Sequence, residues 1–187
     1  MNETLPDVSL MLSIVDTIPV IFFFFTTILI AKKLIKVHIF GSILFYFGSI
    51  ISFIGGILQV IWKLVIAIQS KNIKIFHTQF KFSLSGGFII MILSIIISHS
   101  KINWKATKLK LLKIPCIIFI IIIILCFISL LIFMFKLDSN KSSTNWIEEC
   151  SNIIMQGSVF LCTLIATKNN KVDNQDFDKE CDKNQTV

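Results

Sequence analysis

The sequence predicts an all-α integral membrane protein, a bundle of five transmembrane helices with its N-terminus outside and its C-terminus in the cytoplasm. Of its 187 residues, 55% are hydrophobic, and the mean hydropathy is +0.82. A soluble domain contains about 45–50% apolar residues and intersperses them with charge. Here the apolar residues form long blocks, and the charged residues stand almost entirely between them. Such blocks reach the ~20 residues that a helix needs to cross a bilayer, so the lipid bilayer is the first expected partner.

The predicted spans follow one another through short polar connections, at about 8–31, 39–69, 82–99, 114–135 and 146–167. They form a single transmembrane domain over residues 1–167, and the polar residues 168–187 are predicted to be a disordered cytoplasmic tail. In the first span, Lys32 and Lys33 follow the apolar block. A cleaved signal peptide carries its positive charge before the apolar block, so this segment is predicted to remain as a membrane span.

The distribution of lysine predicts the orientation of the bundle. All 18 basic residues are Lys, and they concentrate at residues 32–36, at 101–113 and in the tail. Positive charge accumulates on the cytoplasmic side of membrane proteins, which places these segments inside and the N-terminus outside. The span at 82–99 is short, and if it were only re-entrant, everything after it would change sides. We expect the protein in the plasma membrane.

The span at 39–69 shows the clearest pattern of small and polar residues. Alternating steps of three and four place one set on a single helical stripe, namely Ser49, Ser52, Gly56, Gln59 and Lys63. Glycine also recurs every seven residues on the adjoining strip, at Gly41, Gly48 and Gly55. Small residues let helices approach closely. These three glycines and Gly56 therefore predict helix packing, either within the chain or between chains of a homo- or hetero-oligomer.

Polar stripes of the same kind mark the first and fifth spans, each with an ionisable residue. At a rise of 1.5 Å per residue, the polar residues of the three spans lie at similar depths in the outer half of the bundle. If the spans are neighbours, six residues converge on a candidate ligand-binding site, namely Asp16, Gln59, Lys63, Glu149, Asn152 and Gln156. Charges inside a bilayer usually pair, so Lys63 is expected to face Asp16 or Glu149.

The same stripes also have a purely structural interpretation. Ser, Thr, Asn and Gln commonly connect membrane helices, at about 0.6 kcal/mol per contact. Lys63 and Glu149 lie near helix ends, where their side chains could extend to the interface. Sequence alone leaves both interpretations open.

The segment 101–113 interleaves lysine with apolar residues, which is typical of a helix lying on the cytoplasmic membrane surface. It predicts contact with anionic lipids through Lys101, Lys105, Lys108, Lys110 and Lys113. A plain positively charged loop is the alternative. The net charge of +7 is explained by orientation in the membrane, and no nucleic-acid partner is predicted, since the chain lacks Arg for bidentate phosphate contacts.

No catalytic residue, metal ligand or cofactor site is predicted. The histidines are scattered, the five cysteines form no CxxC pair, and no nucleotide-binding or hydrolase motif occurs. The sequence therefore favours a non-enzymatic structural or accessory membrane component. The alternative is a small carrier or ligand sensor that uses the polar pocket in the outer half of the bundle. An intramembrane enzyme ranks third, because no nucleophile stands out from the other polar residues.

Overall fold

The computed structural model describes residues 9–69, 73–136 and 142–168, and all regular elements among them are helices. In order they are α1 (Leu10–Val15), α2 (Thr17–Leu34), α3 (Ile39–Gln69), α4 (Lys74–Ser98), the 3-10 turn η1 (His99–Lys101), α5 (Trp104–Leu111), α6 (Ile114–Lys136) and α7 (Ser142–Lys168). With α1 and α2 taken as one span, five helices in this part of the chain are long and apolar enough to cross a membrane. The all-helical prediction is confirmed, and the fold is consistent with a polytopic membrane protein.

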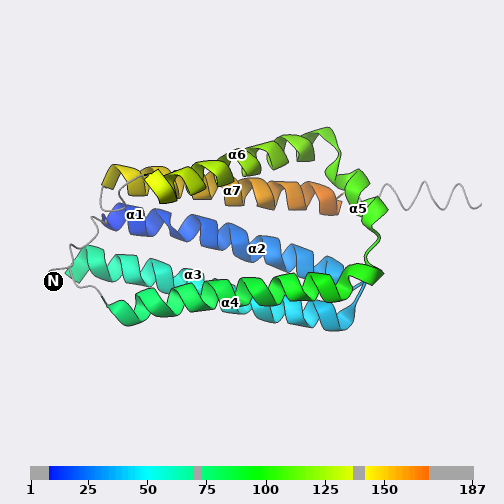
Figure 1. Cartoon of the computed structure of the whole chain (residues 1–187), viewed down its shortest axis with the longest axis horizontal. Coiled ribbons are helices and arrows are strands. Elements are labelled where there is room, and N and C mark those ends of the chain that lie inside the picture. Colours follow the sequence, from blue (N-terminus) through cyan, green and yellow to red (C-terminus); the bar gives the residue numbers. More distant parts are fainter. Residues whose placement is uncertain (1–8, 70–72, 137–141, 169–187) are drawn as a thin grey trace, which may run out of the picture.

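The spans run alternately in opposite directions, and the first of them lies at the centre of the bundle (Figure 1). Helix α2 packs against α3 on one side and against α7 on the other. Helix α4 covers α3, and α6 covers α7, so two helical hairpins flank the central span. The most apolar helix, α6, contacts only α7 and α5 among the described elements, which suits a position facing lipid.

The central span is interrupted at Asp16, which ends α1 and precedes α2. Pro19 explains the interruption. Its ring lacks an N–H and clashes with the carbonyl four residues earlier, at Val15, where α1 ends. Ser9 begins α1 by accepting a hydrogen bond from the Leu12 amide at 3.2 Å, and the Thr17 hydroxyl donates to the Ile14 carbonyl at 2.6 Å. These local bonds hold Asp16 at a fixed point between two helices.

The glycine strip of α3 packs against α4 within the same chain. A Cβ atom at Gly48 would lie 2.7 Å from the carbonyl oxygen of Gly87, and one at Gly55 would lie 2.9 Å from the amide nitrogen of Leu84. Both distances are too short for any side chain, so the two backbones touch because these positions are glycine. Gly41 belongs to this interface as well, since its carbonyl accepts a hydrogen bond from Ser94 at 2.6 Å. Gly56 instead faces Val20 of α2.

Helix α4 is longer than the predicted span at 82–99, because it begins at Lys74. Between Ile73 and Gly86 the chain contains no Gly or Pro, so nothing stops the helix at the edge of the apolar block. Its membrane-compatible part, Thr78–Lys101, is long enough to cross completely, which favours a full span over a re-entrant segment. The predicted tail at 168–187 lies outside the described residues, except for Lys168.

The basic segment predicted to lie on the membrane surface includes α5, which connects α4 to α6 at one end of the bundle (Figure 1). Lys101, Lys105 and Lys108 are exposed, and Lys113 is half-buried. The side chain of Lys110 lies outside the described part. The predicted contact with anionic lipid remains a prediction.

Candidate functional site

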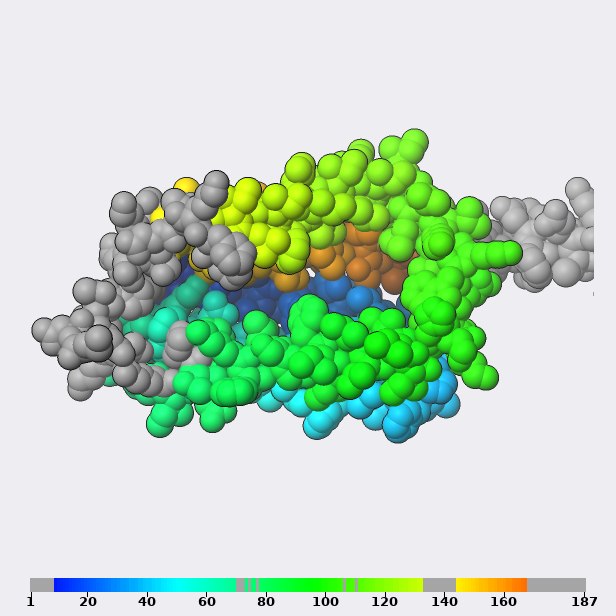
Figure 2. Space-filling model, viewed as in Figure 1, coloured from blue at the N-terminus to red at the C-terminus, as the bar shows by residue number. Residues whose placement is uncertain are grey.

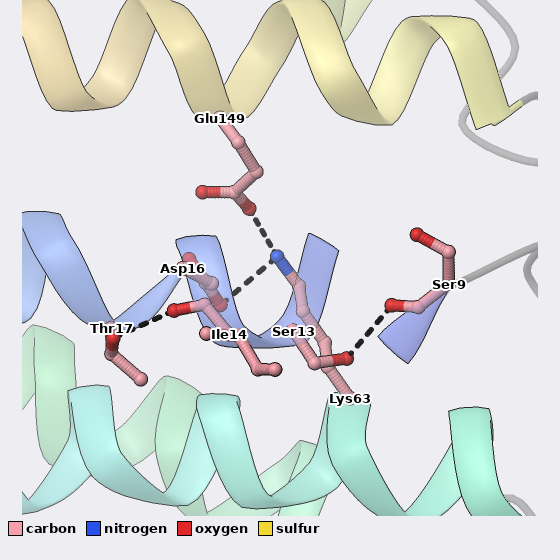
Figure 3. A network of polar contacts seen from close by, with 7 residues as sticks. All are labelled: Ser9, Ser13, Ile14, Asp16, Thr17, Lys63 and Glu149. Carbon is pink, nitrogen blue, oxygen red and sulfur yellow. Dashed lines mark hydrogen bonds and ion pairs between the residues drawn. The ribbon is translucent and has the colours of Figure 1, made fainter. Parts of the chain in front are cut away.

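Three ionisable side chains from three spans meet in the half of the bundle where α1 and α7 begin (Figure 3). Lys63 extends from α3 toward the interruption between α1 and α2. Its Nζ lies 3.1 Å from Oδ2 of Asp16 and also donates a hydrogen bond to Oε1 of Glu149, from α7. Lys63 therefore contacts both of its expected partners, Asp16 and Glu149. We call these three residues the ion triad.

The ion triad is almost fully buried. The side chains of Asp16, Glu149 and Lys63 are 3%, 5% and 13% exposed, respectively. Oε2 of Glu149 is buried and has no hydrogen-bond partner among the described residues, and Oδ2 of Asp16 meets Lys63 as an ion pair without hydrogen-bond geometry. With both carboxylates ionised, the ion triad carries one more negative than positive charge, in a part of the molecule where charge is expensive.

A pocket of about 150 Å³ lies next to the ion triad. Four of the six residues predicted for a ligand site line it, namely Asp16, Gln59, Asn152 and Gln156. The other two, Lys63 and Glu149, are not part of the lining and instead pair with each other and with Asp16. Asp16 is thus the residue that belongs to both the pocket and the ion triad.

The rest of the lining is mostly apolar. Helix α2 contributes Pro19, Val20 and Phe23, helix α4 contributes Leu84 and Phe88, and α3 adds Ser52 and Gly56. Sequence reasoning did not assign these residues to a site. Val20 and Phe23 follow Asp16 at helical spacing, and this signal could have identified them. The residues of α4 could not be found in this way, because they reach the pocket only through the close approach of α4 to α3.

The pocket belongs to a face of the bundle on which α4 and α6 do not meet. Figure 2 shows a furrow between these two helices, with side chains of α2 and α7 at its floor. Within the described residues, the backbone of α4 does not approach that of α6 or α7. Three of the four helices that border this furrow, α2, α4 and α7, also supply lining residues of the pocket.

No family model, curated protein or solved structure matches this chain. The function is therefore argued from the geometry of the pocket and the ion triad.

Proposed function

We propose that this protein is a non-enzymatic carrier or sensor that binds a small polar ligand in the pocket beside the ion triad. One observation carries the proposal: the polar residues of three spans converge on a cavity instead of filling the space between the helices. Pockets for drug-sized ligands have volumes of about 300–1,000 Å³, so a cavity of about 150 Å³ suits a smaller solute.

The interpretation as a structural or accessory component is now the weaker one. Beside the small size of the chain and the absence of motifs, it relied on the glycine face of residues 39–69 as a surface for a partner protein. In this chain α4 covers that face, through the contacts at Gly48 and Gly55. An oligomer that formed through the second span, α3, would have to use another face of this helix.

The described lining of the pocket contains a single hydroxyl group, that of Ser52, and no Cys or His. The hydroxyl group of Ser52 donates to the carbonyl oxygen of Leu84 at 3.5 Å, and the carboxylate of Asp16 faces Lys63.

The proposal is tested by a thermal-shift screen of the purified protein with small anions, cations and neutral solutes. A ligand at about 100 times its Kd stabilises the folded state by about 2.7 kcal/mol, which is readily detected. We expect at least one solute to stabilise the wild type and to act less on Gln156→Leu, in which a pocket amide is lost. The matched control is Gln79→Leu, on the exposed side of α4. A panel without any stabilising solute would contradict the proposal, and flux into proteoliposomes separates a carrier from a sensor.

We further propose that the N-terminus lies outside the cell, that the C-terminus is cytoplasmic and that the protein resides in the plasma membrane. The described lysines at 32–36 and 101–113 support this orientation, since they occupy the same end of the bundle (Figure 1). A variant that retains only Cys181 should react with an impermeant maleimide after permeabilisation and not in intact cells. Labelling of intact cells would refute the orientation.

A further inference from the structure

We propose that the ligand of this pocket is a small organic cation, an ammonium ion that carries a short apolar group. The inference rests on the proposed ligand-binding function and adds the chemical class of the ligand. It follows from the charge of the ion triad, from an unused carboxylate oxygen and from the two kinds of wall in the pocket.

The charge of the ion triad is the first step. Two carboxylates share the single ammonium group of Lys63, and all three side chains are largely buried. A buried charge without compensation is strongly unfavourable, so the two carboxylates take up either a proton or a cation, and a cationic ligand would replace that proton. The negative partner that a ligand can reach from the pocket is Asp16, because this residue also lines the cavity. An anionic ligand would find no counter-charge there, since the described lining contains no Lys, Arg or His.

The unused oxygen of Glu149 is the second step. Glu149 is 4% exposed, and its Oε2 lacks a hydrogen-bond partner among the described residues. In Figure 3 this oxygen is turned away from Lys63, toward the side on which Thr17 begins α2 and away from Ser9. The pocket lies on the same side, because its lining from the central span continues from Asp16 to Phe23. Because Glu149 does not line the pocket, a cation bound at Asp16 would act on this buried oxygen through its charge and not through a direct hydrogen bond.

The third step concerns the lining of the pocket, which has a polar wall and an apolar wall. Gln59, Asn152 and Gln156 offer amide oxygens that can accept hydrogen bonds from an ammonium group. Phe23, Leu84 and Phe88 form an apolar wall, and aromatic rings also attract cations. A bare metal ion would use only the oxygens and leave this wall without a partner. The volume of about 150 Å³ is below that of pockets for drug-sized ligands, which suits a small cation such as propylammonium.

The test compares three probes of similar size and different charge: propylammonium chloride, propionamide and sodium propionate. Each is titrated into the purified full-length protein at constant ionic strength, with melting temperature and calorimetric heat as readouts. We expect propylammonium alone to bind and to raise the melting temperature. Asp16→Asn should weaken this binding roughly tenfold or more, because it removes the surplus negative charge that the ligand meets. Glu148→Gln is the matched control, since it removes an exposed carboxylate one residue from Glu149 and should leave binding unchanged.

If Asp16→Asn fails to fold, Asn152→Leu replaces it, because this change removes a pocket amide and leaves the ion triad intact. Propylammonium that stabilises the wild type and a pocket variant equally would overturn the inference. Binding of propionate or propionamide without binding of propylammonium would also overturn it, while the pocket would stand as a ligand site. A failure of all three probes together with the wider screen would remove the proposed function as well.

Discussion

Helix α3 has two interfaces with opposite requirements: one needs close backbone contact, and the other needs a long side chain. Toward α4, glycines at Gly48 and Gly87 bring the backbones into contact, and the hydroxyl group of Ser94 donates to a carbonyl of the facing helix. Toward α7 there is no backbone approach among the described residues, and the connection is the side chain of Lys63. Close packing requires the absence of side chains, whereas a site requires a long side chain that reaches across a space. One helix provides both by placing them on different strips.

Polar groups are also satisfied differently at the two interfaces. On the α4 side, Ser94 and Ser98 donate to backbone carbonyls and leave no partner missing. On the α7 side, the buried oxygens without hydrogen-bond partners in the described structure belong to Asp16 and Glu149. The first interface is complete within the chain, and the second has unused acceptors. The following substitutions test this contrast, from the largest expected effect to the smallest.

Lys63→Met should be the most damaging change. It leaves two buried carboxylates without a positive partner, and loss of one member of a buried ion pair costs about 3–5 kcal/mol. Reversible unfolding of the purified protein in mixed micelles measures the loss, with Lys81→Met on an exposed part of α4 as control. Adding Asp16→Asn and Glu149→Gln to Lys63→Met should restore much of the stability. A triple variant as unstable as the single one would show that the charges are not the cause.

Gly87→Ala should destabilise the α3–α4 interface by about 1–3 kcal/mol, as overpacking does in protein interiors. The new Cβ would lie 2.6 Å from the amide nitrogen of Ser52, which belongs to a helix backbone and cannot yield. The neighbouring Gly86 is an ideal control, because a Cβ there meets nothing within 4 Å. Gly86→Ala should be neutral or gain up to about 1 kcal/mol from helix propensity. Equal effects of the two variants would mean that the helices do not approach this closely.

Asp16→Asn should change the free energy of unfolding by no more than about 1 kcal/mol, since it leaves Lys63 and Glu149 as a balanced pair. The same unfolding assay compares it with Lys63→Met, which should be less stable by at least about 2 kcal/mol. This asymmetry distinguishes a site with surplus negative charge from an ordinary ion pair. If the two variants were equally unstable, the ion triad would have no surplus charge.

Ser94→Ala should have the smallest effect, about 0.6 kcal/mol, which is the average for a hydrogen bond between membrane helices. It removes the bond to the carbonyl of Gly41 and keeps the close approach of the helices. Ser85→Ala, on the exposed side of α4, should leave the unfolding curve unchanged. A loss near that of Gly87→Ala would mean that hydrogen bonds, and not close packing, hold this interface.

The helical stripes were enough to predict that Asp16, Lys63 and Glu149 would lie at one depth, because depth depends only on the rise per residue and on short connections. Helical periodicity does not encode the distance between helices, so it could not predict that a cavity would remain between them. It also missed the early start of α4 at Lys74, since that segment is polar and nonetheless lacks a residue that stops a helix. Phe88 lines the pocket because α4 packs closely against α3. Helical periodicity does not encode this distance, so it could not predict the contribution of Phe88.

The position of Lys63 gives the bundle a connection that no pair of neighbouring helices could supply. The backbones of the α3–α4 hairpin and the α6–α7 hairpin do not approach each other within the described residues, and the ion pair of Lys63 with Glu149 is the described salt bridge that joins them. A cation that drew Glu149 away from Lys63 would weaken this link and leave the two hairpins joined through α1, α2 and the connecting helix α5. Occupancy of the pocket would then loosen the direct side-chain connection between the two halves of the bundle.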